Sequence, residues 1–225
     1  MGVSYRPMTG AIVRTGAERA TLVRRTYSLV FVSVLVTMAG TAFAMSQPRI
    51  MGAVAAHPIL TMIAMFAPLM AAMSFRDRFP ANIGLVFLFT FVEGIFISPI
   101  IYYMQLKSPG VVGQAAVLTG SSFGILTLYA WFSRRDFSAW GSFFTIGLWV
   151  LIATSLLNMF FQNTTASLWI SAATVLVFSG LLIFDTWRLR NVFGPNDYIQ
   201  AAVTIYLDLL NMFLAILNLL GNRRN

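Results

Sequence analysis

The sequence predicts an all-α integral membrane protein, a bundle of seven transmembrane helices. Its 225 residues are 58% hydrophobic and 10% charged, with a mean hydropathy of +0.79. An ordinary soluble domain has roughly a quarter of its residues charged. The few charged residues lie in short groups between long apolar runs, and the loops between these runs are too short to form a soluble domain.

The apolar runs define the spans in chain order. One bilayer crossing needs about 20 apolar residues. The uncharged run 137–184 is too long for a single crossing, and the polar stretch 162–165 divides it in two. Helices are favoured over barrel strands because the runs lack alternating polar residues. The expected spans lie in 26–48, 59–75, 79–106, 108–133, the two parts of 137–184, and 198–222.

Basic loop residues predict the orientation, because cytoplasmic loops carry an excess of Lys and Arg. With a cytoplasmic N-terminus, the inner side receives Arg6, Arg14, Arg19, Arg24, Arg25, Arg76, Arg78, Arg134, Arg135, Arg188 and Arg190. The outer side receives Arg49, Lys107, Arg223 and Arg224. We therefore expect a basic cytoplasmic tail (1–25), a membrane domain (26–222) and an outer C-terminus. A signal peptide cleaved after Ala42-Phe43-Ala44 is an alternative, which the long first apolar stretch disfavours.

Composition excludes several classes of function. The chain has no cysteine and one histidine, so disulfides, thiolate metal sites and histidine-based catalysis are not expected. It has no Walker motif, no HExxH motif and no nucleophile elbow. The net charge of +8 is explained by membrane orientation rather than by nucleic-acid binding. We expect no enzyme activity, no tightly bound cofactor, and the lipid bilayer as the main partner.

The last span carries a polar stripe. At 100° per residue, its polar and small residues share one narrow face, while the rest of the helix is almost wholly apolar. These residues are Asp197, Ala201, Thr204, Asp208, Asn211, Ala215, Asn218 and Asn222. Such a face lines a polar cavity or pathway inside the bundle, and a pure helix-packing face is the alternative.

Three acids lie in or near the spans, and intramembrane acids are functional candidates by default. Asp208 and Glu93 lie within spans, whereas Asp185 lies near the inner end of the sixth. For Asp185, pairing with a nearby arginine at the interface is an equal alternative. The cores of the spans offer no basic partner beyond His57, at the start of the second. These acids must therefore share protons, meet water or bind a cation.

The segment 179–217, SGLLIFDTWRLRNVFGPNDYIQAAVTIYLDLLNMFLAIL, resembles the C-terminal signature of the Bax inhibitor-1 family, also called the transmembrane Bax inhibitor motif family. The matching features are Asp185-Thr186, a short basic loop, Asp197-Tyr198, and Tyr206-Leu207-Asp208 followed by Asn211. FTFVEGIFISPI, in the third span, is similar to another family segment. Trp187, where the family commonly has glutamine, and the additional acid Glu93 depart from the family pattern.

The resemblance implies a seven-helix bundle with the C-terminal helix at its centre. It also implies a pH-sensitive calcium leak, in which Asp185 and Asp208 form a proton-sharing pair that senses pH and meets calcium. An arginine at the inner end of the second span participates in gating within the family, and Arg76 and Arg78 are equal candidates. The spacing of the residues does not by itself bring the two aspartates together.

We therefore expect a pH-gated calcium leak in a bacterial plasma membrane, with Asp185, Asp208, Glu93, Thr204 and Asn211 lining the path. Two alternatives stay open. One is a non-conducting regulator that binds other membrane proteins, with the small-residue face of Gly120 and Gly124 as a contact surface. The other is a proton-coupled transporter of a small solute.

Overall fold

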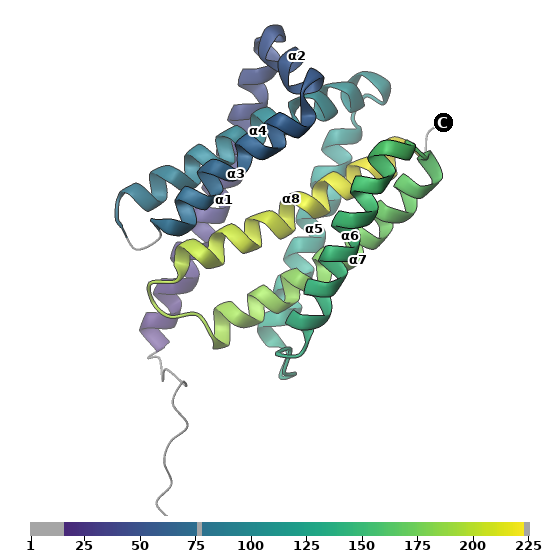
Figure 1. Cartoon of the computed structure of the whole chain (residues 1–225). Coiled ribbons are helices and arrows are strands. Elements are labelled where there is room, and N and C mark those ends of the chain that lie inside the picture. Colours follow the sequence, from purple (N-terminus) through teal and green to yellow (C-terminus); the bar gives the residue numbers. More distant parts are fainter. Residues whose placement is uncertain (1–15, 76–77, 223–225) are drawn as a thin grey trace, which may run out of the picture.

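The computed structural model describes residues 16–75 and 78–222, and these residues form helices joined by short turns. Figure 1 shows the helices side by side in one bundle. Their bounds are α1 Gly16–Ser46, α2 Pro48–Ala56, α3 Pro58–Ser74, α4 Ala81–Lys107, α5 Val111–Phe132, α6 Trp140–Phe161, α7 Thr164–Asn191 and α8 Tyr198–Asn222. The described chain contains no strand, which confirms the all-α prediction.

Six of the described helices are long and apolar enough to cross a membrane, namely α1, α4, α5, α6, α7 and α8. The count reaches seven when α2 and α3, a pair bent by 98°, are taken as one span. The sequence placed the second span at 59–75, and α3 occupies that run with 17 residues. The short helix α2 lies in a predicted loop. The helix α1 begins at Gly16, so the end of the predicted tail 1–25 is helical.

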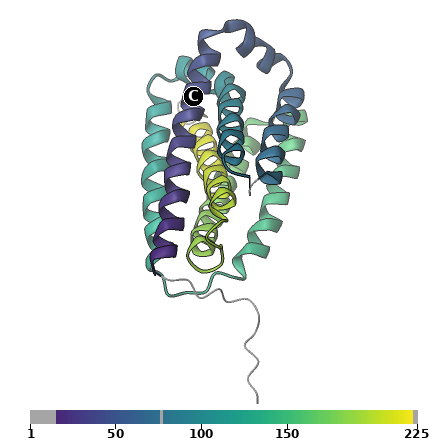
Figure 2. The same cartoon turned by 90° about the vertical axis from the view of Figure 1, so that its left-hand side faces the viewer.

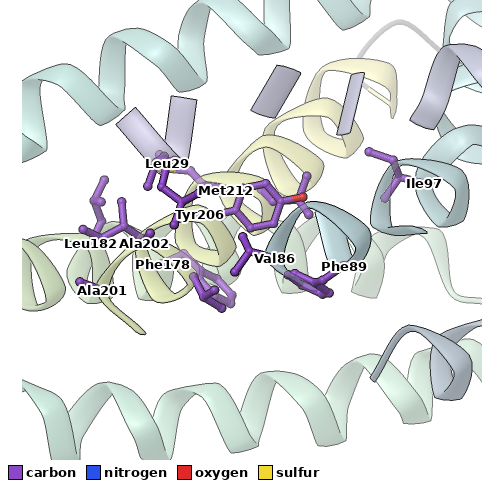
Figure 3. Packing of buried hydrophobic residues seen from close by; sticks show 14 of the residues in the cluster. Leu29, Val86, Phe89, Ile97, Phe178, Leu182, Ala201, Ala202, Tyr206 and Met212 are labelled. Carbon is purple, nitrogen blue, oxygen red and sulfur yellow. The ribbon is translucent and has the colours of Figure 1, made fainter. Parts of the chain in front are cut away.

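The C-terminal helix α8 lies at the centre of the bundle. It packs against α1, α4, α5 and α7, and Figure 2 shows it surrounded by the other helices. The buried share of its apolar stretch is 44%, against 6% for α6 at the periphery. Figure 3 shows Tyr206 of α8 among Leu29, Val86 and Phe89 of the neighbouring helices. The central position of the last helix therefore agrees with the predicted architecture.

Glycines bring α1 and α4 into backbone contact. A Cβ on Gly40 would lie 2.2 Å from the carbonyl oxygen of Phe91, and one on Gly94 would lie 2.1 Å from that of Thr37. The hydroxyl of Thr41 donates to the carbonyl oxygen of Gly94 at 2.9 Å. Close approach of small residues and hydroxyl hydrogen bonds are the usual means of joining helices in lipid.

The small residues of α5 do not make the close backbone contact that Gly40 and Gly94 make. A Cβ on Gly120 or Gly124 would meet no atom within 4 Å, so these glycines make no close helix contact within the described chain. The helix α3 packs chiefly against α4 and exposes large apolar side chains, including Leu60 (65%) and Ile63 (60%). Exposed apolar side chains of this kind suit a helix that faces lipid.

Candidate proton and cation site

The helices α7 and α8 bring two carboxyl groups together inside the bundle. Asp185 of α7 is 6% exposed and Asp208 of α8 is 4% exposed. Their carboxyl groups lie close enough to interact directly. The structure therefore places side by side two acids that are separated by 23 positions in the sequence.

The length of α7 explains how the two acids meet. Sequence patterning places Asp185 at the membrane boundary, but α7 continues to Asn191. Six further residues carry the helix about 9 Å beyond Asp185 at 1.5 Å per residue. After a short turn, in which Asp197 Oδ2 accepts the N–H of Gly194 at 2.6 Å, α8 runs back past the same level. Asp208 lies ten residues into α8, about 15 Å from its start. The remaining difference in depth is small enough for side chains to close.

A hydrogen bond between two carboxyl groups requires a proton. Two carboxylates offer only acceptor oxygens, so one member of the pair must be protonated. The Nη1 atom of Arg188 lies 2.9 Å from Asp185 Oδ1, and this ion pair favours the negative charge on Asp185. A proton shared by the two carboxyl groups would therefore reside on Asp208. Its Oδ2 atom is buried and accepts no hydrogen bond from an N–H or O–H group of the described residues.

Aromatic rings hold Arg188 beside the pair. Its guanidinium carbon lies 4.4 Å from the ring centroid of Phe193 and 5.5 Å from that of Phe184. Cations are attracted to the faces of aromatic rings at such distances. The Arg188 side chain is 26% exposed and thus reaches from the carboxyl pair towards solvent. Asp185 therefore has both Arg188 and Asp208 as neighbours, so an arginine partner and an aspartate partner do not exclude each other.

The polar stripe of α8 divides into two parts. In the inner part, the Thr204 hydroxyl is a hydrogen-bonding partner of Asp185 and also lies 3.2 Å from the carbonyl oxygen of Ala201. Asn211 is half-buried, and its Nδ2 donates to the carbonyl oxygen of Leu207 in its own helix at 2.8 Å. Thr204 thus belongs to the aspartate site, whereas the hydrogen bond of Asn211 is local.

In the outer part the stripe is a packing surface. Asn218 Nδ2 lies 2.9 Å from Ser167 Oγ and 2.7 Å from Ser171 Oγ, both in α7. Asn222 Nδ2 donates to Asn218 Oδ1 at 2.7 Å. The two serine contacts join α7 to α8, so the packing alternative describes this half of the stripe.

Glu93 lies apart from the aspartate pair. It is 5% exposed on α4, and its Oε2 atom has no hydrogen-bonding partner among the described residues. It interacts electrostatically with Tyr206 of α8. Glu93 of α4 is thus separate from the aspartate pair, which lies between α7 and α8.

Of the two candidate gating arginines, Arg78 lies between α3 and α4. Arg76 lies outside the described residues. Arg78 is exposed, and its guanidinium carbon lies 5.2 Å from the ring centroid of Phe75. Among the described residues, the ion-pair partner of Asp185 is Arg188. A gating role for Arg78 thus stays a prediction from the resemblance.

Two carboxylates alone make a weak resident metal site. Within the described ranges, no three His, Cys, Asp or Glu side chains gather as metal ligands. Calcium takes 6–8 oxygen ligands as a rule. Asp185 and Asp208 would therefore meet calcium as a passing ion that keeps part of its water shell.

These features define a helical integral membrane protein with an ionisable site inside its membrane domain. Residues 19–225 match the family described as inhibitor of apoptosis-promoting Bax1. The chain therefore belongs to the Bax inhibitor-1 family.

Similar proteins come from a virus, an animal and a bacterium. Golgi anti-apoptotic protein of vaccinia virus is 34% identical over 205 residues, which cover 90% of this chain and 85% of the viral protein. Protein lifeguard 4 of Mus musculus is 30% identical, with the same coverage of 90% and 85%. An uncharacterized protein of Campylobacter jejuni is 32% identical over 212 residues, covering 91% of this chain and 89% of its own length.

Proposed function

We propose that this protein is a calcium leak of the membrane, gated by protonation of the pair Asp185 and Asp208. The close approach of these two buried carboxyl groups is the observation that carries the proposal. The proposal places the protein in a bacterial plasma membrane, with the N-terminus in the cytoplasm, and assigns it no enzymatic step.

Opening and closing of the proposed leak depend on the charge of the aspartate pair. While Asp208 keeps its proton, it donates to Asp185 and holds α7 against α8. When the proton leaves, two negative charges face each other in a region poor in water, and their repulsion favours separation of the two helices. Arg188 compensates only one of these charges. The leak should therefore open as pH rises and close as it falls.

The same residues supply suitable ligands for the ion. Calcium prefers carboxylate and other oxygen ligands, and the ionised pair offers four carboxylate oxygens, with the hydroxyl of Thr204 nearby. Because no further acid joins the cluster within the described chain, binding stays weak enough for release. A leak needs such a site, since tight binding would stop the flow.

The test is calcium flux into liposomes that contain the purified protein, measured over a range of pH. We expect wild-type flux to rise with pH. Asp208→Asn keeps a hydrogen-bond donor towards Asp185 without an ionisable proton, so its flux should stay low at every pH. The expected loss at alkaline pH is on the order of tenfold, a typical coupling between a ligand and a conformational equilibrium.

Two further variants make the test specific. Asp185→Asn removes the charge repulsion and should also abolish the pH response. Asp136→Asn is the matched control, because Asp136 lies in the loop between α5 and α6 and accepts a local hydrogen bond from the backbone of Ser138 at 2.8 Å. It should behave as wild type. Unchanged flux and pH response in both pair variants would refute the proposal.

A non-conducting regulator is the second candidate. The open face of α5 at Gly120 and Gly124 favours it, since small residues with free space above them admit a helix of another membrane protein. The viral relative is named as an anti-apoptotic protein. This candidate predicts no flux from the purified protein, and loss of partner binding when Gly120 is replaced by Phe.

A further inference from the structure

A cleft of about 680 Å³ opens at the end of the bundle where α1 begins. It lies between α1, the first turns of α4 and the start of α8, away from the contact between α7 and α8. Its lining comprises Arg25, Ser28, Leu29, Val32, Phe79, Asn82, Ile83, Phe87, Asn196 and Tyr198.

The polar groups of the cleft gather at one level. Arg25 lies over the ring of Tyr198, with 5.7 Å between its guanidinium carbon and the ring centroid. Asn82 Nδ2 lies 3.4 Å from the hydroxyl oxygen of Tyr198. Asn82 is the second residue of α4 and Tyr198 the first of α8. These three side chains therefore form the polar end of the cleft.

The apolar lining lies deeper. Val32 follows Arg25 by seven residues along α1, or about 10 Å, and Phe87 follows Asn82 by five along α4, or about 7 Å. Leu29 and Ile83 lie between these levels on the same helices. The cleft thus changes from polar to apolar in the direction that leads from the membrane surface towards its centre.

The polar end of the cleft carries a positive charge. Arg25 is exposed, and among the described residues no carboxylate forms an ion pair with it. Asp197 precedes Tyr198 in the chain, and its Oδ2 atom accepts a hydrogen bond from the N–H of Gly194. Arg24 and Arg78 are also exposed at this end of the bundle. The charge suits an anion, and the apolar wall suits a hydrocarbon chain.

We propose that the cleft binds one anionic phospholipid from the leaflet on the N-terminal side. Its phosphate lies against Arg25, beside the ring of Tyr198. One acyl chain follows Leu29, Val32 and Phe87. Val32 is 37% exposed and Phe79 is 74% exposed, so the cleft is open to the surrounding lipid. Basic pockets between membrane helices recognise acidic headgroups in this manner. This proposal does not depend on ion conduction.

Binding can be tested with the full-length protein in detergent. Native mass spectrometry would count retained lipids, and thermal unfolding would measure stabilisation, with phosphatidylglycerol compared with phosphatidylcholine of the same acyl chains. We expect wild type to retain phosphatidylglycerol preferentially. Arg25→Gln should weaken that binding roughly fivefold, the contribution of one basic residue near an anionic headgroup.

The matched control is Arg24→Gln, because Arg24 is the neighbouring exposed arginine and does not line the cleft. It should keep most of the binding. Val32→Trp fills the apolar end and should reduce retention while Arg25 stays in place, which keeps the test usable if Arg25→Gln folds poorly. Inorganic phosphate should not stabilise the protein.

Three results would overturn the proposal. The first is equal retention of the two lipids. The second is an equal loss in the Arg24 and Arg25 variants, which would indicate attraction to surface charge in general. The third is full stabilisation by inorganic phosphate, which would indicate a site for a soluble anion.

Discussion

The hydroxyl oxygens of Thr37 and Tyr206 lie 2.7 Å apart and join α1 to the central helix α8. Thr37 Oγ1 also lies 2.9 Å from the carbonyl oxygen of Ser33 and 3.1 Å from that of Thr90. Because carbonyl oxygens only accept, the Thr37 hydroxyl donates to one of them. Tyr206 must then donate to Thr37. This bond links α8 to the α1–α4 pair at a buried position.

Replacing Tyr206 by Phe should therefore destabilise the protein. The change keeps the ring packed on Phe89, at 6.0 Å between centroids, and removes only the hydroxyl. We expect a loss of about 1 kcal/mol in the free energy of unfolding, measured by thermal or denaturant unfolding in detergent. Tyr129→Phe is the control, since Tyr129 is 44% exposed. Equal stability of the two variants would contradict this assignment.

Alanine substitutions should lower stability at a glycine that contacts a neighbouring helix and should not do so at a glycine that faces open space. Gly94→Ala places a Cβ 2.1 Å from the carbonyl oxygen of Thr37, a backbone atom that cannot yield cheaply. We expect a loss of stability of about 3 kcal/mol, the upper part of the usual range for overpacking. Gly120→Ala meets no atom within 4 Å, and should be neutral or stabilising by up to about 1 kcal/mol. Melting curves of the two variants in one detergent provide the comparison.

Arg188→Gln should shift the pH at which calcium flux is half-maximal. The guanidinium favours negative charge on the pair, so without it the protonated, closed arrangement persists to higher pH. We expect an upward shift of roughly one pH unit. Arg190→Gln is the control, because the Nη1 atom of Arg190 donates to the carbonyl oxygens of Trp131 and Ser133 and not to the pair. It should change stability and leave the midpoint in place; a downward shift in Arg188→Gln would show that the sign is wrong.

Glu93→Gln tests whether Glu93 contacts the permeating ion or takes part in sensing pH. Glu93 lies outside the aspartate cluster, so the substitution should leave the pH midpoint of flux unchanged. If Glu93 meets the passing ion, the neutral amide should lower the maximal flux several-fold, within the usual range of coupling energies. The readout is the flux curve over pH in liposomes. A shifted midpoint would place Glu93 in the sensor.

Sequence patterning predicted the helical membrane fold and the polar face of α8, because both depend on periodicity within a single helix. It could not tell which neighbour each part of that face would meet. Asp208 meets Asp185, whereas Asn218 meets Ser167 and Ser171. All three neighbours lie on α7, and helical spacing in α8 contains no information about them.

The main feature that the sequence left undetermined was the depth of Asp185 in the membrane. Charges mark the membrane boundary, and Arg188 and Arg190 therefore suggested that the sixth span ends near Asp185. The helix continues to Asn191 because its basic side chains bind aromatic rings and carbonyl oxygens. The short helix α2 was missed because nine residues that include Arg49 do not form a recognisable span.

The backbone contact at Gly40 and Gly94 limits where an ion could cross the bundle. Even a partly dehydrated cation needs a gap several ångströms wide, and the two helices that meet at these glycines leave none. In the proposed leak, the permeation route therefore avoids the α1–α4 contact and follows the contact between α7 and α8. A covalent crosslink that fastened α1 to α4 would leave such transport intact, whereas one that fastened α7 to α8 would arrest it.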